Sequence, residues 1–269
     1  MIAVLSLSWT YVYPAVLSIL ATVAVFEILR VFRLDKRLFV AIAAYVVAFS
    51  LPLVAYFMMD YMQLNAGDYL LVMSLVLFMF MLYLFVVAIF ERGRMPFGEF
   101  AGAFMITAYV VAAFSSLSVV RLIENVGIYC LGLVLVTAWI TDTFAYVVGS
   151  LIGKHKLIPE ISPKKTVEGS IGGIVFSMIG TMLYGLLISL FTDITPNYIV
   201  LAIAGLILSV ISQVGDLIAS LIKREHNVKD YGSILPGHGG IMDRFDSILS
   251  VSTATMIISL IFTPFTLII

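Results

Sequence analysis

Residues 198–246 read YIVLAIAGLILSVISQVGDLIASLIKREHNVKDYGSILPGHGGIMDRFD, an apolar run to residue 224 followed by a polar loop. The run is long enough to cross the hydrocarbon core as a helix, which takes about 20 residues. The loop surrounds a Gly-His-Gly-Gly turn with charged groups, namely Lys223, Arg224, Lys229, Asp230, Asp243, Arg244 and Asp246. Its bases can bind phosphates and its carboxylates can bind a divalent cation. The stretch therefore predicts a membrane helix that ends in a phosphate-binding loop.

Apolar runs of this length recur along the chain, of which 62% is hydrophobic and only 12% charged. A soluble domain is nearer one half apolar, so most of this surface must face lipid. The runs lie at 11–32, 38–60, 68–90, 101–120, 128–153, 170–191, 198–224 and 245–268. They predict an all-α, polytopic membrane bundle with eight full spans. Residues 1–9 are apolar but too short to span, and we expect them to be the end of a partial ninth helix.

No linker or low-complexity tract divides the chain, so residues 1–269 are expected to form a single membrane-embedded domain. Alternate connections between the runs hold 14 of the 15 basic residues. These are Arg30, Arg33, Lys36, Arg37, Arg92, Arg94, Lys154, Lys156, Lys164, Lys165, Lys223, Arg224, Lys229 and Arg244. Lys and Arg concentrate on the cytoplasmic side of membrane proteins. The two long polar loops, 153–173 and 220–246, are therefore predicted to face the cytoplasm from the inner membrane.

Ionisable residues inside the apolar runs are candidate site residues, because each is costly in the bilayer unless it is paired, hydrated or metal-bound. Asp142 lies in the middle of one run and Asp216 lies about eight residues before the end of another. Ser212, Asp216, Ser220 and Lys223 are spaced 4, 4 and 3 apart, which draws a polar stripe along a helix toward the loop.

Asp243 and Asp246, at i and i+3, are expected to project from one face of the last helix toward the same cavity. Rather than serving the site, Asp142 and Asp246 could pair with Arg244 or with neighbouring hydroxyls. Glu27 lies three positions before Arg30, which favours a local ion pair.

The earlier loop, GKHKLIPEISPKKTVEGSIGG over 153–173, also carries a phosphate-binding pattern. Ser162, Lys164 and Lys165 surround a Ser-Pro turn and suit a polyphosphate. Positive-inside topology is the competing explanation for these lysines, and it leads for Lys154 and Lys156. His238 stands between two glycines, where it could donate a hydrogen bond or a proton to a phosphate or serve only the turn.

The second loop resembles the signature of phosphatidate cytidylyltransferases over its whole length. The pattern runs from Ser220 through Lys223-Arg224, Lys229-Asp230 and Pro236-x-His238-Gly239-Gly240 to Asp243-Arg244-x-Asp246. Ser162-Pro163-Lys164-Lys165-Thr166 with Glu168-Gly169 is similar to a second, shorter block of the same family.

The resemblance implies that CTP and phosphatidate react in the membrane to give CDP-diacylglycerol and pyrophosphate. It implies Mg²⁺ at Asp216 and Asp243, with Asp142 and Asp246 as further candidate ligands, and it leaves open a second cation, monovalent or divalent. Lys223, Arg224 and His238 are expected beside the reacting phosphates. Substrate contacts are expected from Ser162, Lys164, Lys165, Ser220, Lys229, Asp230, Gly239, Gly240 and Arg244. No nucleic-acid partner is predicted, and a homodimer stays open.

Two other classes of protein remain as alternatives. A CTP-dependent membrane kinase for a polyprenol-type lipid would share the metal and triphosphate site but would attack the γ-phosphorus. The complete Pro-Gly-His-Gly-Gly and Asp-Arg-Phe-Asp elements favour the cytidylyltransferase. An ion-coupled transporter could use Asp142 and Asp216, yet it would not need such a basic cytoplasmic surface, and no inverted repeat is detected.

Overall fold

A computed structural model describes residues 12–91, 96–233 and 239–267 of the protein. Eight helices within these ranges are long and apolar enough to cross a membrane, which confirms the predicted all-helical class and the eight spans. They are α2 (Val12–Val31), α3 (Leu38–Tyr56) continued by the π-helical turn η1 (Phe57–Tyr61), α4 (Ala66–Phe90), α5 (Phe97–Arg121), α6 (Gly127–Ile152), α7 (Val167–Phe191), α8 (Tyr198–Glu225) and α9 (Met242–Phe262). The partial ninth helix expected over 1–9 lies outside the described residues.

Three helices, α5, α7 and α9, begin three or four residues before the apolar runs that predicted them. α7 begins at Val167 because the Thr166 hydroxyl accepts a 3.1 Å hydrogen bond from the Gly169 N–H and caps the helix. α9 begins at Met242, so its first turn includes Asp243. Hydropathy detects only the apolar part of each helix, whereas these helices begin in the polar sequence that precedes it.

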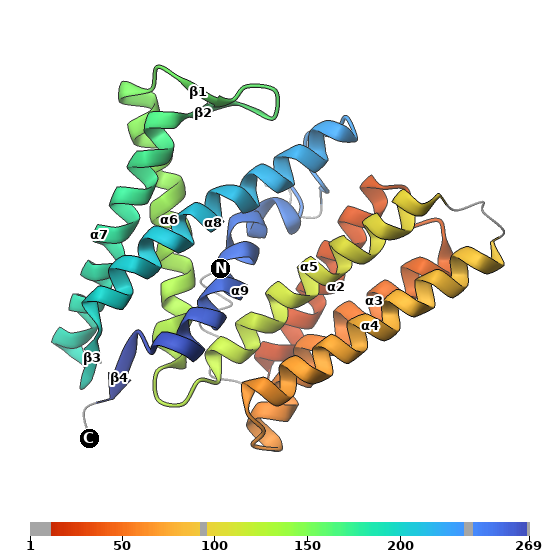
Figure 1. Ribbon diagram of the computed structural model, residues 1–269, viewed down its shortest axis with the longest axis horizontal. Helices are drawn as coiled ribbons and strands as arrows, with labels where there is room; N and C mark the ends of the chain where they lie inside the picture. Colours follow the sequence, from red (N-terminus) through yellow and green to blue (C-terminus); the bar gives the residue numbers. More distant parts are fainter. Residues whose placement is uncertain (1–11, 92–95, 234–238, 268–269) are drawn as a thin grey trace. The chain divides into compact units, whose positions relative to one another are not determined.

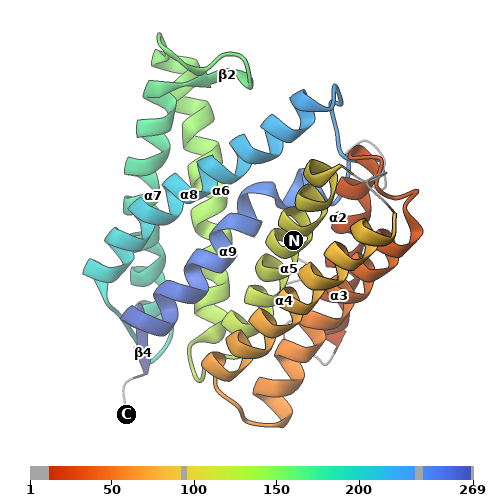
Figure 2. The ribbon, with the colours of Figure 1, turned by 45° about the vertical axis from the view of Figure 1, so that its right-hand side comes forward.

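The chain divides into two compact units, and the first comprises residues 1–122 and 226–244. Among its described parts, α2, α3 and α5 pack against one another, and α4 packs against α3 and α5 (Figure 2). The buried Tyr13 hydroxyl donates to the Leu117 carbonyl at 3.2 Å and joins α2 to α5. α4 buries only Ala66, Tyr69, Phe80 and Leu84, as a lipid-facing helix does. This unit carries most of the second polar loop.

The second unit comprises residues 123–225 and 245–269. α6 and α7 lie side by side, with α8 packed against both (Figure 1). Gly169 and Gly173 permit this contact, because a Cβ on either would meet the α6 backbone at 2.5 Å and 3.0 Å respectively. A short antiparallel hairpin, β1 (Lys156–Ile158) with β2 (Ser162–Thr166), joins α6 to α7. The first polar loop is therefore a structured hairpin fixed above two closely packed helices.

A second strand pair lies at the opposite end of this unit. β3 (Ile194–Pro196) pairs antiparallel with β4 (Phe265–Leu267). β3 precedes α8 and β4 follows α9, so two complete helices separate the paired strands. Both strands must therefore lie on the same side of the membrane, which agrees with the predicted alternation of the spans.

Candidate active site

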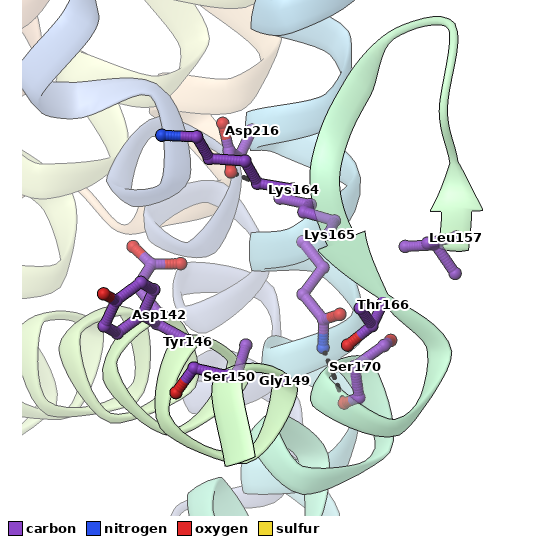
Figure 3. Close-up of a pocket in the computed structure, with 12 residues that line it drawn as sticks. Asp142, Tyr146, Gly149, Ser150, Leu157, Lys164, Lys165, Thr166, Ser170 and Asp216 are labelled. Carbon is purple, nitrogen blue, oxygen red and sulfur yellow. Dashed lines mark hydrogen bonds and ion pairs between the residues drawn. The ribbon is translucent and has the colours of Figure 1, made fainter. Parts of the chain in front are cut away.

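The α6–α8 unit contains a cavity of about 280 Å³ beneath the β1–β2 hairpin (Figure 3). Four elements contribute polar side chains to it, of which only β2 and α7 are consecutive in sequence. These are Asp142, Tyr146 and Ser150 from α6, Lys164, Lys165 and Thr166 from β2, Ser170 from α7, and Gln213 and Asp216 from α8. The hairpin lysines and the mid-helix carboxylates, which the sequence identified separately, thus line one cavity.

An ion pair joins the hairpin to α8 inside this cavity. The Lys165 Nζ lies 2.5 Å from the Asp216 Oδ2, and the side chains are 25% and 27% exposed. The Ser220 hydroxyl, one turn further along α8, donates to the Asp216 Oδ1 at 3.5 Å. Lys164 is exposed and has no hydrogen-bond or ionic partner among the described residues. A polyanion entering here would meet one uncommitted ammonium group and one that neutralises Asp216.

The hairpin is held in place by polar contacts at both of its ends. Glu168, in the first turn of α7, accepts hydrogen bonds from the backbone N–H groups of Lys154 and His155, and its Oε1 lies 2.6 Å from the His155 Nδ1. The Arg224 Nε donates to the Ile161 carbonyl at 3.3 Å, which ties the end of α8 to the hairpin turn. Lys223 also lies in the last turn of α8. Ser162 begins β2, two residues before Lys164.

A serine bridges the two other predicted carboxylates. The Ser247 hydroxyl donates to the Asp142 Oδ2 at 3.0 Å, and the Ser247 N–H donates to the Asp246 Oδ1 at 2.8 Å. This is the pairing with a neighbouring hydroxyl that the sequence left open. Asp142 and Asp216 both act electrostatically on Asp246. The unit therefore gathers three carboxylates whose charges repel one another when ionised.

The second polar loop, in the other unit, is organised by carboxylates that accept hydrogen bonds from its backbone. The Asp243 Oδ2 accepts from the N–H groups of Tyr231 at 2.8 Å and Gly240 at 3.1 Å. Gly239 has φ +81°, a left-handed conformation that glycine adopts readily, and it packs against the same carboxylate. Arg244 follows in the first turn of α9, where its N–H donates to the Ile241 carbonyl. His238 lies outside the described residues.

Glu27 has a different role from the one expected. Its side chain is 1% exposed, and no ion pair joins it to Arg30 within the described part of the chain. Its two oxygens instead accept from the backbone N–H groups of Ile241 at 3.0 Å and Met242 at 2.9 Å. The local spacing was misleading because free N–H groups at the start of α9 provide better-oriented donors.

A second cavity, of about 420 Å³, lies beside this loop in the first unit. It is lined by Arg30, Val31, Arg33, His226, Val228, Asp230, Tyr231, Gly232 and Ser233. Lys229 is exposed next to it. The His226 ring packs on Phe32 with centroids 4.2 Å apart, which fixes one wall. This cavity presents two guanidinium groups and one carboxylate.

The donor chemistry around Asp216 suits a hard divalent cation, which prefers carboxylate and hydroxyl oxygens. Within the described residues, however, no three His, Cys, Asp or Glu side chains are arranged as a preformed metal site. Asp216 is neutralised by Lys165, while Asp142 and Asp246 are linked through Ser247. The residues fit such an ion by type and charge.

Several contributors were not found from the sequence. Ser247 and Gln213 were not identified from the sequence, and Glu168 was noticed only as part of a motif. Gln213 donates from its Nε2 to the Ser170 carbonyl at 3.2 Å and so joins α8 to α7 at the cavity wall. The i, i+3 and i, i+7 offsets of Gln213 from Asp216 and Ser220 could have placed it on the polar stripe.

The model of the cytidylyltransferase family matches residues 1–262. A phosphatidate cytidylyltransferase of Staphylococcus haemolyticus is 40% identical over 190 residues, which is 70% of each chain. Proteins of the same name from Staphylococcus saprophyticus and Bacillus subtilis are 43% and 40% identical over 61% and 63% of this chain. The aligned segments make up 60% and 62% of those two relatives, which is less than two thirds of their length.

Proposed function

The chain belongs to the cytidylyltransferase family, and from that premise we propose that it transfers the cytidylyl group of CTP to phosphatidate. The products are CDP-diacylglycerol and pyrophosphate. The observation that carries the proposal is the cavity in which Lys164, Lys165 and Asp216 meet. Its relatives named phosphatidate cytidylyltransferases support the choice of lipid.

The reaction needs no protein nucleophile. A phosphate oxygen of phosphatidate forms a bond to the α-phosphorus of CTP. The bond between that phosphorus and the oxygen that bridges it to the β-phosphorus breaks. Pyrophosphate leaves with the electron pair. The task of the chain is then to hold two polyanions together and to stabilise the charge that moves to the leaving group.

The basic residues of the first loop are proposed to bind the triphosphate. Lys164 is uncommitted, and Lys165 can exchange its contact with Asp216 for a phosphate oxygen. Lys223 and Arg224 lie in the last turn of α8, and Arg224 already contacts the hairpin. Ser162 and Ser220 add hydroxyl donors beside these bases. The backbone turn at Gly239 and Gly240, with Lys229, Asp230, Arg244 and His238, is proposed to contact substrate phosphates on the strength of the sequence signature.

We propose Mg²⁺ as the cofactor, held by Asp216 with Asp142 and Asp246 as neighbouring acids. When bound, the ion would neutralise the triphosphate and polarise the phosphorus under attack. Asp243 is also a proposed ligand, on the strength of the sequence signature alone.

We also propose an orientation in the membrane and a single catalytic domain. The distribution of Lys and Arg supports a cytoplasmic location for both polar loops, at the surface of the cell membrane. Both compact units are assigned to one catalytic domain, because the family model extends over residues 1–262.

Labelled CTP tests the proposed chemistry. With purified protein, magnesium and phosphatidate, label at the α-phosphorus should enter the lipid and label at the γ-phosphorus should leave as pyrophosphate. Diacylglycerol or a polyprenol should accept neither. Transfer of γ-label to a lipid alcohol, with no α-label in lipid, would assign the protein to the lipid kinases instead.

Cysteine accessibility tests the orientation. Single cysteines at Glu160 and Glu124, in a Cys130→Ser background, should behave oppositely toward an impermeant thiol reagent in intact cells. Position 124 should react and position 160 should react only after lysis. Labelling of position 160 from outside would invert the topology. Cys130 itself is buried, so replacing it should not disturb the surface.

A further inference from the structure

The C-terminal half of α2 contains a carboxylate whose contacts are with the signature loop and the start of α9. Glu27 is 1% exposed, and both of its oxygens accept backbone N–H groups at the start of α9. The partners are 214 and 215 positions away along the chain. A buried carboxylate in an apolar helix is costly, so contacts of this kind indicate a specific use.

Two glycines of the loop are close enough to Glu27 that a side chain would collide with it. A Cβ at Gly240 would lie 2.5 Å from both carboxylate oxygens, and a Cβ at Gly232 would also collide with the Oε1. The carboxylate thus lies between the two arms of the loop and holds the start of α9. Neither glycine is explained by a turn alone, because neither has a positive φ.

The same two loop arms carry the contacts of Asp243. Tyr231 and Gly240, whose N–H groups bind the Asp243 carboxylate, are adjacent in sequence to Gly232 and Ile241, which contact Glu27. One carboxylate from α2 and one from α9 therefore fix the backbone of the loop from two sides. Moving Glu27 would shift the first turn of α9, where Asp243 lies.

We infer that Glu27 is a positioning residue for the cytidylyl-transfer site, acting through the loop backbone on the orientation of Asp243. The inference rests on the proposed function for its catalytic readout but not for its structural one. It predicts that Glu27→Gln lowers kcat by about ten- to a hundredfold, because the amide loses the charge-assisted bond to one of its two N–H partners. The KM for CTP should change far less.

Hydrogen exchange provides the structural readout and needs no activity. The amides of Ile241 and Met242 should exchange faster in Glu27→Gln than in the wild-type protein. Glu124→Gln, an exposed glutamate of the second unit, is the matched control and should change neither exchange nor kcat. If the wild-type protein showed no cytidylyl transfer, the proposed function would be refuted, but the hydrogen-exchange comparison would still test the role of Glu27.

A rescue experiment separates positioning from simple damage. Gly232→Ala should displace the carboxylate, and Glu27→Asp should draw it back by one methylene. Each single variant should lose activity, and the pair should recover part of the loss, because the shorter side chain makes room for the new methyl group. The inference would be overturned if the activity losses of Gly232→Ala and Glu27→Asp were additive in the pair and if Glu27→Gln left amide exchange unchanged.

The neighbouring cavity supports a second inference on separate grounds. Arg30 and Arg33 line it, and neither guanidinium group has an ionic or hydrogen-bond partner among the described residues. Ser233 adds a hydroxyl, and Val31 and Val228 add apolar wall. Its volume of about 420 Å³ is more than a phosphate group needs. Two guanidinium groups that line one cavity can bind a phosphate, and they outnumber its one carboxylate, Asp230.

We propose that this cavity binds the phosphate head group of an anionic lipid. Thermal unfolding of the solubilised protein tests it without reference to catalysis. Phosphatidate should raise the unfolding midpoint of the wild-type protein more than phosphatidylcholine does. The Arg30→Gln/Arg33→Gln double variant should lose that difference, and Lys36→Gln, an exposed base in the same connection, should keep it.

Pyrophosphate is the second arm of the same experiment. A shift with pyrophosphate but not with phosphatidate, lost in the double variant, would make the ligand a soluble phosphate and overturn the lipid assignment. An equal phosphatidate shift in the wild-type protein and the double variant would overturn the site itself.

Discussion

The two polar loops hold their charged groups in different ways. In the first, Glu168 fixes the start of the hairpin through backbone N–H groups, but the cavity lysine Lys165 pairs with Asp216 through side chains alone. In the second, Glu27 and Asp243 accept hydrogen bonds from backbone N–H groups. A side-chain pair can be exchanged for a phosphate by a change of rotamer, whereas a backbone contact cannot be released without moving the chain. The first loop is therefore suited to binding, and the second to fixed geometry.

Among the substitutions that test this comparison, Asp216→Asn should cause the largest fall in turnover. The substitution removes the charge that Lys165 neutralises and a proposed metal ligand at once. Replacing residues that only support a metal ligand typically costs ten- to a hundredfold, so turnover should fall by at least about a hundredfold. The measurement is α-label transfer over a range of magnesium concentrations, with Asp193→Asn, at an exposed position, as the control. Wild-type turnover in Asp216→Asn would refute its assignment to the metal.

Asp243→Asn should have the next largest effect, and it distinguishes a ligand from a scaffold. The amide keeps a carbonyl oxygen for the N–H groups of Tyr231 and Gly240, so the loop should survive. Turnover should still fall by roughly a hundredfold as the charge is lost, and excess magnesium should restore part of it. A loss that magnesium leaves unchanged would restrict Asp243 to holding the loop.

Substitutions of the two hairpin lysines should affect different kinetic parameters. Lys164→Ala removes an uncommitted ammonium group, so it should raise the KM for CTP by about tenfold or more and leave kcat nearly intact. Lys165→Ala also releases Asp216 and should lower kcat as well. Steady-state kinetics in CTP separate the two parameters. Identical profiles for the two variants would show that the ion pair with Asp216 has no part in turnover.

Ser247→Ala should have the smallest effect. It removes the 3.0 Å hydrogen bond to Asp142 while the backbone bond to Asp246 remains. One hydrogen bond is worth about 0.5–1.5 kcal/mol, so a decrease in unfolding midpoint of a few degrees and a few-fold fall in turnover are expected. Ser189→Ala, which removes an exposed hydroxyl on α7, is the control. Equal changes in unfolding midpoint and turnover in the two variants would mean that the Ser247 link between Asp142 and Asp246 contributes neither to stability nor to catalysis.

The sequence was sufficient for the eight spans because each is a long apolar run, and hydropathy depends only on local composition. It also identified Asp142, Lys165 and Asp216, since ionised groups in or beside apolar helices are conspicuous. The β1–β2 hairpin was missed because its strands are three and five residues long and the second contains a proline and two lysines. Glu27 was misassigned because its partners are more than 200 positions away. Contacts of that range depend on helix packing, which local spacing does not contain.

The distance between Glu27 and its partners also bears on how the protein is made. α2 enters the membrane long before Ile241 and Met242 have been synthesised, because 214 positions separate Glu27 from the nearer one. During that interval the carboxylate lacks the two N–H groups that satisfy it in the finished fold. An unsatisfied acid in the bilayer is unfavourable, so early intermediates should keep the end of α2 near the headgroup region. Arrival of α9 would then complete the insertion of α2 as well as its own, so we expect assembly of this enzyme to include a late, concerted step rather than to proceed only helix by helix.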